Sequence, residues 1–487
     1  MAHKPHAICV PFPAQGHINP MLQVAKLLHS KGFHITFVNT EYIHNRILRS
    51  NPTSLCDFLN FRFETISNGL DPLDHEANLD VTTVCCALSN NCLAPFLNLI
   101  QKLNDGVASE VPPVTCIVSD GGMSFTIDAA QQLGIPDVLF WTSSGCGVLG
   151  YTHYPHLVEK GLAPLKDASY LTNGYLETTV DWIPGMKTIR LKDLPTFFRT
   201  TDPNDLYFNW ILREVDRASR ASAIIMNTYD SLEEDALNSL CKMYPHLYSI
   251  GPLHLLVDQI KNNNGIKNIF PSLWKEDEEK ERELLCWLDS KNPDSVLFVN
   301  FGSTTVMTIE QLKEISWGLA NSKKNFLWVL RLDHVEGEDL NEILTKEFLD
   351  DIKERGMLVS WCPSQEKILE HSSIVGFLSH MGWNSTLESL CCGIPMICLP
   401  NFSDQTTVCR YACSEWGIGI EIDKNFKREE IEKVIIELME GEKGKEMKKK
   451  ATEWKRKAQE ATSYGGSSYD NLDKVLEILL GNNKMDN

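Results

Sequence analysis

A histidine and an aspartate follow two apolar segments of the N-terminal half and could act together as a general base. His17 lies in the loop after residues 7–10, and Asp120 directly follows the apolar run at 114–119. In a doubly wound sheet the carboxyl ends of two such strands can lie close together. A carboxylate on one ring nitrogen fixes the imidazole tautomer, so the other nitrogen can take a proton from a hydroxyl. The spacing permits this pair, although a lone histidine in such a loop more often has a structural role.

Two glycine-containing turns in the C-terminal half are typical of phosphate-binding sites. The first turn, residues 301–305, comes at the end of the apolar run 296–301. The second, residues 380–384, follows the apolar run 374–379. A turn that opens a helix presents free backbone N–H groups and the positive end of the helix dipole, which bind anions. Two such turns in one α/β half predict a diphosphate ligand at the carboxyl ends of its strands.

The helix after the second turn is expected to begin near Ser385. His380, Asn384 and Ser385 would add side-chain donors for a phosphate. Ser385 and Glu388 also match the S-x-x-E capping box, in which the two side chains bind backbone N–H groups at the helix start. A purely structural role for this pair therefore stays open.

The net charge limits the partners that the chain can bind. Its 487 residues contain 46 Lys and Arg against 65 Asp and Glu, a formal net charge of −19. Nucleic acids and anionic membranes need a basic surface, so neither is an expected partner. An anionic ligand must then be held by local donors against an unfavourable overall field.

Cysteine usage and hydropathy predict an intracellular protein without a membrane span. The chain has 15 cysteines, an odd number that includes adjacent pairs at 85–86 and 391–392, so reduced thiols are expected rather than disulfides. The first residues lack a signal-peptide pattern, and no run of 18 apolar residues occurs.

Short apolar runs alternate with helical patterns along most of the chain, which is typical of βαβ units around parallel sheets. Each half has enough runs for one sheet, and they lie at 7–10, 35–39, 114–119, 138–141 and 223–227, then at 296–301, 326–330, 357–360, 374–379, 396–399 and 418–422. The polar stretch at 258–283 contains little that could pack. The predicted organisation is an N-terminal Rossmann-like domain at 1–251, a linker at 252–283, a C-terminal Rossmann-like domain at 284–458, and a helical segment at 459–487 that packs back on the N-terminal domain.

The C-terminal half also carries a long motif, made of Trp361-Cys362-Pro363, Gln365, His380, Gly382-Trp383-Asn384-Ser385-Thr386, Glu388, Gly393, Pro395, Pro400 and Asp404-Gln405. It resembles the signature box of the plant family-1 UDP-sugar-dependent glycosyltransferases. Further matches lie at 16–20, 118–120, 170–177 and 301–305, so the resemblance covers nearly the whole chain. Within the family the chain is most similar to the branch that acts on cyanohydrins, terpenoids and other small aglycones. The chain departs from the pattern at three positions. Ser364 is an extra residue, and Met381 and Leu399 replace the residues that the family usually has there.

The resemblance implies an α/β GT-B fold, in which two Rossmann-like doubly wound parallel-sheet domains face each other across a cleft. It implies an inverting UDP-glucose-dependent O-glucosyltransferase that transfers glucose to a hydroxyl of a small hydrophobic plant metabolite. The acceptor would be of the terpenoid, cyanohydrin, phenolic or flavonoid type, and the products a β-glucoside and UDP. UDP-glucose would be a co-substrate, with no tightly bound cofactor and no metal. The enzyme would be a cytoplasmic monomer without integral membrane association.

Family roles transfer to matching positions of this chain. His17 would be the catalytic base and Asp120 its orienting partner. The donor-site residues would be Trp361 and Cys362 at the uracil, Gln365 and Glu388 at the ribose, Ser303, His380, Asn384 and Ser385 at the diphosphate, and Trp383, Asp404, Gln405 and Thr142 at the sugar. Five aromatic and apolar residues of the N-terminal loops are candidates for the acceptor pocket, namely Ile18, Met123, Trp141, Phe197 and Phe198.

Other functions fit parts of the sequence. Residues 145–150 match the G-x-G-x-x-G pattern of nicotinamide oxidoreductases, but the strand context is poor and close helix packing explains the glycines more simply. A nucleotide-sugar sensor would explain the donor half but not His17 and Asp120. His153 and His156 are spaced like metal ligands, yet no cysteine or carboxylate cluster lies near them in the sequence, so a zinc site is not expected. The cysteines are expected to be buried small hydrophobes.

Overall fold

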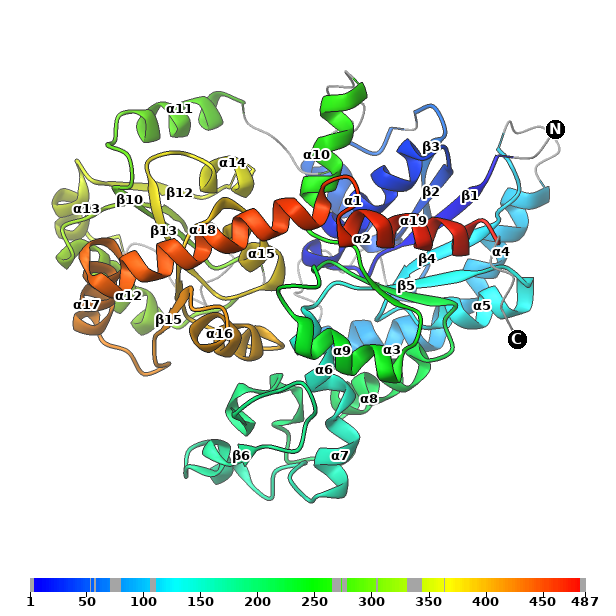
Figure 1. Ribbon diagram of the computed structural model, residues 1–487, viewed down its shortest axis with the longest axis horizontal. Helices are drawn as coiled ribbons and strands as arrows, with labels where there is room; N and C mark the ends of the chain where they lie inside the picture. Colours follow the sequence, from blue (N-terminus) through cyan, green and yellow to red (C-terminus); the bar gives the residue numbers. More distant parts are fainter. Residues whose placement is uncertain are drawn as a thin grey trace. The chain divides into compact units, whose positions relative to one another are not determined.

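The structure is a computed structural model (Figure 1), and it describes residues 4–52, 54–56, 58–70, 80–105, 111–264, 273, 278–303, 305–330, 344–362 and 364–481. The chain divides into two compact units. Unit 1 comprises residues 1–191, 197–275 and 460–487, and unit 2 comprises 192–196 and 276–459. Each unit is built around its own parallel sheet, as the sequence pattern predicts.

Unit 1 contains a seven-stranded parallel sheet in the order β3-β2-β1-β4-β5-β8-β9. Its strands are β1 (His6–Val10), β2 (His34–Thr40), β3 (Phe61–Ile66), β4 (Cys116–Asp120), β5 (Asp137–Trp141), β8 (Ala223–Met226) and β9 (Leu247–Ser249). The apolar runs of the sequence correspond to the five inner strands, and neither edge strand was predicted. Edge strand β3 is half-exposed over most of its length and contains Arg and Glu, and β9 has only three residues, so neither gives a strong apolar run. A separate antiparallel pair joins β6 (Thr179–Val180) to β7 (Ile189–Arg190).

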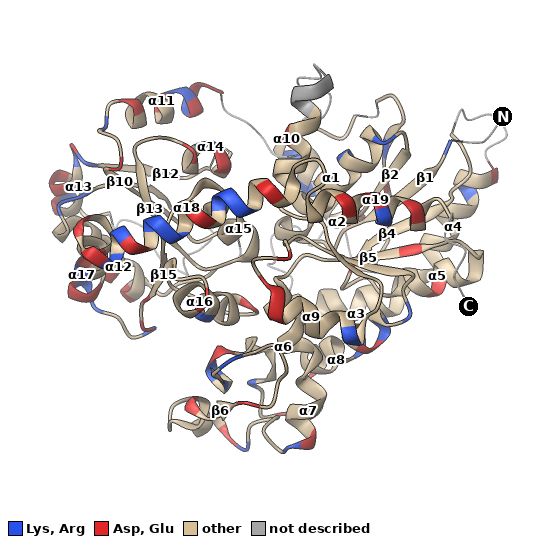
Figure 2. Cartoon of the chain, viewed as in Figure 1, with Lys and Arg blue, Asp and Glu red and all other residues tan. Residues whose placement is uncertain are grey.

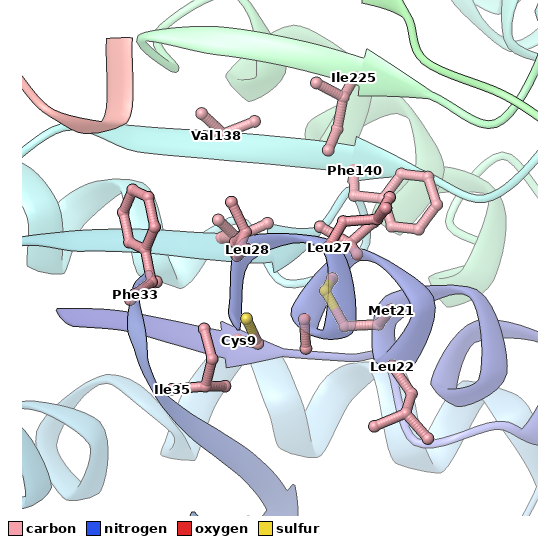
Figure 3. Close-up of a cluster of buried hydrophobic side chains, with 14 of the residues drawn as sticks. Cys9, Met21, Leu22, Leu27, Leu28, Phe33, Ile35, Val138, Phe140 and Ile225 are labelled. Carbon is pink, nitrogen blue, oxygen red and sulfur yellow. The ribbon is translucent and has the colours of Figure 1, made fainter. Parts of the chain in front are cut away.

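The helices of unit 1 supply the apolar side chains that cover its sheet. They are α1 (Gln15–Ser30), α2 (Glu41–Ser50), α3 (Val81–Asn91), α4 (Leu93–Asp105), α5 (Phe125–Leu133), α6 (Gly145–Thr152), α7 (Tyr154–Glu159), α8 (Leu206–Ala218), α9 (Glu234–Met243), α10 (Leu253–Asn264) and α19 (Ser467–Leu479). In α1 the apolar positions recur with helical spacing, and Met21 and Leu28 lie in the core among Phe33, Val138 and Phe140 (Figure 3). Burial of this stripe positions the start of α1, where His17 lies.

The first part of the segment predicted as a linker is a helix that packs in the core of unit 1. α10 begins there, and Leu253, Leu256 and Val257 pack into the same core cluster as α1. The boundary between the units falls after residue 275, and residues 265–272 and 274–277 lie outside the described part of the chain. From the predicted C-terminal segment, α19 adds Leu472 and Val475 to the core of unit 1.

Unit 2 contains a six-stranded parallel sheet in the order β12-β11-β10-β13-β14-β15, and each strand corresponds to a predicted run. The strands are β10 (Val296–Asn300), β11 (Asn325–Val329), β12 (Gly356–Val359), β13 (Ile374–Ser379), β14 (Met396–Cys398) and β15 (Gly419–Glu421). The helices are α11 (Glu278–Asp289), α12 (Ile309–Asn321), α13 (Lys346–Ile352), α14 (Gln365–Leu369), α15 (Trp383–Cys392), α16 (Gln405–Ser414), α17 (Arg428–Glu440) and α18 (Glu442–Thr462). Its core joins α12 and α17 to the sheet.

Helix α18 shows how the basic stretch of the sequence is used. Lys and Arg form blue bands along this helix (Figure 2), while Met447, Ala451 and Ala458 are buried. The basic residues therefore share a helix with an apolar stripe, as amphipathic spacing predicts.

Among the described residues, no single helix is both long enough and apolar enough to cross a membrane. The consecutive helices α3 and α4 pass such a test only as a pair, and they bend by 56° at the break between them.

Candidate active site

His17 and Asp120 meet at the point where the strand order of the first sheet reverses. β1 and β4 are neighbours in the sheet, with Val10 opposite Ser119, so the loop after β1 lies beside the end of β4. His17 is in the first turn of α1, and its Nδ1 lies 2.8 Å from Oδ2 of Asp120. The imidazole is 35% exposed and the carboxylate only 3%. A buried carboxylate thus holds a half-exposed imidazole.

Both carboxylate oxygens of Asp120 are engaged. Oδ1 accepts a hydrogen bond from the backbone N–H of Gly122 at 2.9 Å, which fixes the plane of the carboxylate. Thr142, which follows the neighbouring strand β5, places its hydroxyl 2.8 Å from Nδ1 of His17. Thr142, predicted as a sugar-binding residue, lies with its hydroxyl against the imidazole. The proton on Nδ1 is therefore surrounded by acceptors, and the Nε2 lone pair is the basic position.

Aromatic side chains continue from His17 and form what we call the aromatic wall. The ring of Phe12 lies 5.0 Å from the imidazole centroid and 6.0 Å from that of Trp210. Trp210 stacks on Tyr207 at 5.5 Å, and Tyr207 meets Phe197 edge-on at 4.4 Å. This arrangement offers an apolar surface next to a base, which suits a small hydrophobic alcohol.

The predicted acceptor residues divide into two groups. Phe197 belongs to the aromatic wall. Ile18, Met123 and Phe198 are at most 1% exposed and contribute to packing, and Trp141 lies under Gly121, where an added Cβ would stand 2.6 Å from its indole. Three residues of the aromatic wall, Phe12, Tyr207 and Trp210, were not predicted from the sequence. The signal for the last two was their three-residue spacing on α8, which places them on one helix face.

The two predicted phosphate turns of unit 2 meet at His380. β10 and β13 are neighbours with Asn300 opposite Ser379, so the chain leaves both strands at the same edge. A Cβ on Gly302 would stand 2.7 Å from the His380 ring, and one on Gly382 would stand 2.4 Å from its Nε2. Gly302 also has φ of +76°, a conformation that favours glycine. The imidazole is thus held between the two turns, and Ser303 lies in the first of them.

A polar network joins the predicted ribose and diphosphate residues. Asn300 donates from Nδ2 to Oε1 of Gln365 at 2.8 Å. Gln365 in turn donates to Oγ of Ser385 at 3.0 Å and to Oε2 of Glu388 at 2.6 Å. Burial, reinforced by the charge of Glu366, raises the pKa of Glu388 to about 8. A neutral Glu388 would donate as well as accept, which suits a ribose hydroxyl.

Helix α15 begins earlier than predicted, and this removes the capping-box alternative. Its first residue is Trp383, and the N-cap position is Gly382, which has no side chain to cap the helix. Ser385 and Glu388 lie inside the helix and contact Gln365 instead. Asn384 and Ser385 occupy the first turn, and Trp383 is buried with its ring 6.0 Å from that of Trp416.

The predicted sugar residues Asp404 and Gln405 lie at the start of α16. Both are buried, and Gln405 accepts backbone N–H bonds from Asn401 at 2.9 Å and Phe402 at 3.1 Å. The segment 192–196 belongs to this unit and binds the same turn, because Ser403 donates its N–H to Oγ1 of Thr196 at 2.8 Å.

The predicted uracil residues Trp361 and Cys362 follow β12 and are both half-buried. The Sγ of Cys362 lies 3.9 Å from Nδ2 of Asn300, so this segment joins the polar network. The extra Ser364 accepts the backbone N–H of Lys367 and caps α14, which leaves Gln365 directed at α15.

The glycine run at 145–150 has a structural explanation. It forms α6, and the N–H groups of Gly145 and Cys146 each donate to the buried Glu233 carboxylate at 2.8 Å. A carboxylate already fills the position that a dinucleotide phosphate would need, which argues against the oxidoreductase alternative. In the H-x-x-H pair, the two imidazoles lie 5.3 Å apart beside the Trp182 ring.

Comparison with known proteins agrees with the geometry. The family model described as UDP-glucoronosyl and UDP-glucosyl transferase matches residues 15–452. A 7-deoxyloganetin glucosyltransferase of Gardenia jasminoides is 57% identical over 482 residues, which cover 99% of this chain and 98% of that protein. A (R)-mandelonitrile beta-glucosyltransferase of Prunus dulcis is 56% identical over 479 residues, covering 98% and 97%.

Solved structures resemble the chain over almost its full length. A UDP-glucosyltransferase from Polygonum tinctorium capable of glucosylating indoxyl, in complex with 3,4-dichloroaniline, matches with a TM-score of 0.79 and 30% identity. The match covers 98% of this chain and 99% of that one. Os79 from O. sativa in complex with UDP matches with a TM-score of 0.76 and 26% identity, covering 96% and 99%.

Proposed function

Because the chain belongs to the UDP-glucoronosyl and UDP-glucosyl transferase family and is a UDP-glycosyltransferase of the GT-B fold, we propose that it transfers glucose from UDP-glucose to a hydroxyl of a small hydrophobic plant metabolite. The transfer inverts the anomeric configuration and gives a β-glucoside and UDP. The acceptor is of the terpenoid or cyanohydrin type, because the names of two similar proteins specify 7-deoxyloganetin and mandelonitrile. The aromatic wall supports an apolar acceptor.

The observation that carries this proposal is the contact between His17 and Asp120. With its Nδ1 proton directed at the carboxylate, 2.8 Å away, His17 accepts the acceptor's hydroxyl proton at Nε2. The freed oxygen attacks the anomeric carbon from the face opposite UDP, and the bond from that carbon to the diphosphate oxygen breaks. Asp120 stabilises the imidazolium that forms, as in other carboxylate–histidine pairs.

The diphosphate that leaves carries negative charge, which the donor residues offset. His380 lies between the two turns, and Asn384 and Ser385 stand in the first turn of α15, where the helix dipole is positive. The sequence contains no Asp-x-Asp triplet, so we assign this role to protein donors rather than to a metal clamp. Trp361 and Cys362 hold the uracil, Gln365 and Glu388 the ribose, and Asp404 and Gln405 the sugar.

The proposal extends to the cellular compartment and the oligomeric state of the enzyme. None of the fifteen cysteines, from Cys9 to Cys413, forms a disulfide in the described part of the chain, which fits a reducing compartment such as the cytoplasm. We also assign the enzyme a monomeric working unit.

Replacement of His17 tests the proposal. His17→Ala should lower turnover of UDP-glucose with a mandelonitrile or iridoid acceptor by about 10³-fold, the usual contribution of a general base, while UDP binds as before. His29→Ala, on the same helix α1, is the matched control and should keep its turnover. Proton NMR of the product should show a β-anomer. Full turnover by His17→Ala, as a nucleotide-sugar sensor or another base would allow, or an α-anomer, would overturn the mechanism.

A further inference from the structure

Three cysteines of unit 2 gather their sulfur atoms in one place. Cys398 is the last residue of β14, and Cys409 and Cys413 lie one turn apart on α16. All three Sγ atoms lie within 4.8 Å of one another, and those of Cys398 and Cys413 are 4.0 Å apart. Cys398 and Cys409 are buried, whereas Cys413 is partly exposed and gives the cluster a side open to solvent.

These separations suit a metal ion bound by three sulfurs. A metal–thiolate bond of about 2.3 Å places three trigonal sulfurs about 4 Å from each other. Structural zinc takes four ligands. Among the described residues, no histidine or carboxylate joins the three thiols in this cluster. Soft thiolate ligands select Cu(I), which accepts such an all-sulfur site. We propose that Cys398, Cys409 and Cys413 form a three-thiolate binding site for Cu(I).

Cysteine binds a metal ion as the thiolate, so each thiol of the cluster must lose its proton on binding. Binding of Cu(I) forms three Cu–S bonds and releases these protons to solvent, with no change of oxidation state.

The backbone of β15 closes the cluster on another side. A Cβ added to Gly419 would stand 2.8 Å from Sγ of Cys398 and 3.0 Å from Sγ of Cys413. The sulfurs thus pack directly against this glycine. The site is also distinct from the donor residues on the same helix, because Gln405 starts α16 and Cys413 lies near its end.

Titration of the full-length reduced protein with Cu(I) under argon, in competition with bicinchoninate, tests the site. Wild type should retain one equivalent of Cu(I), visible as sulfur-to-copper charge-transfer absorption, and X-ray absorption should show three sulfur neighbours. Cys413→Ala, at the partly exposed position, should lose that equivalent. Cys391→Ala, a buried helical cysteine outside the cluster, is the matched control and should keep it.

A second variant leaves all three ligands in place. Gly419→Ala would crowd the sulfurs and should weaken Cu(I) retention by at least about tenfold, with UDP affinity measured on every variant to verify folding. Retention of the equivalent by both Cys413→Ala and Gly419→Ala would overturn the proposal. Its loss in Cys391→Ala, or its displacement by an equal concentration of Zn²⁺, would do so as well.

Discussion

The two sheets of this protein place polar residues at the same topological position but give them different chemistry. In unit 1 the loops after β1 and β4 bring a carboxylate to an imidazole, a hydrogen-bonded pair in which the carboxylate orients the ring. In unit 2 the turns after β10 and β13 enclose an imidazole between two glycines and add amide and hydroxyl groups. The strand-order reversal determines where a site lies, and the loop residues determine what it does.

The two sites also differ in how they suit a protein with a net charge of −19. The first site needs negative charge, because a carboxylate stabilises the imidazolium. The second binds an anion in an acidic protein, and it relies on glycine turns, on a helix start and on a carboxyl, Glu388, whose pKa is raised to about 8. A raised pKa keeps this carboxyl neutral over most of the neutral range, so it adds little repulsion toward a diphosphate.

Breaking the hydrogen-bonded pair of His17 and Asp120 should give the largest effect. In Asp120→Asn the amide can bind the imidazole with the proton on the wrong nitrogen, which removes the basic Nε2 lone pair. We expect kcat to fall by about 10³-fold or more, with UDP affinity unchanged. Asp137→Asn, which replaces another buried carboxyl of the same sheet, is the control and should stay close to wild type. Equal losses of kcat in both variants would contradict an orienting role for Asp120.

Distorting the glycine turn should affect the other site and leave the first intact. Gly302→Ala would place a Cβ 2.7 Å from the His380 ring, so either the ring or the turn must shift. We expect UDP affinity, measured by calorimetry, to fall by about 10- to 100-fold, the equivalent of about 1.4 to 2.8 kcal/mol.

The control for Gly302→Ala isolates the backbone strain. Gly465 has the same φ of +76° but nothing within 4 Å of an added Cβ. Gly465→Ala therefore carries the strain without the clash, and its UDP affinity should match wild type. If both variants lost affinity equally, contact with His380 would not be the cause.

Sequence patterns predicted the fold well where burial is strong. All strands of the second sheet and the inner strands of the first read as apolar runs, because parallel strands are covered on both faces. The edge strand β3 and helix α10 were missed. In β3 the half-buried positions include Arg62 and Glu64, and in α10 an apolar first half, with Leu253 and Leu256 in the core, leads into a polar second half.

The site residues, too, could be paired from the sequence only where they follow strongly apolar strands. His17 and Asp120 could be paired from the sequence because each ends a recognisable strand of one sheet. The position of Thr142 at the imidazole depends on the exact register of β5, which a sequence pattern does not specify. The contact of Gln365 with Glu388 and the cysteine cluster depend on how helices pack. The sequence pattern does not specify this packing, so neither contact could be predicted.

The third prediction concerns how the stability of unit 2 depends on pH, and it involves no change in turnover or UDP affinity at a fixed pH. The pKa of Glu388 is about 4.3 in an unfolded chain and about 8 in the fold. Between these values the folded state holds one more proton than the unfolded state, so the free energy of unfolding falls as pH rises, by up to about 1.4 kcal/mol per pH unit. Glu388→Gln should remove this decline, seen as a smaller loss of Tm between about pH 5 and pH 8 than in wild type.

Glu370→Gln, at an exposed position of the same unit, is the control and should retain the wild-type slope. An unchanged slope in Glu388→Gln would mean that its carboxyl is ionised in the fold. The second site would then rely on a charged acid, as the first does, and the chemical difference between the two sites would be smaller. A reduced slope would instead place a neutral carboxyl among the proposed ribose-binding residues of unit 2.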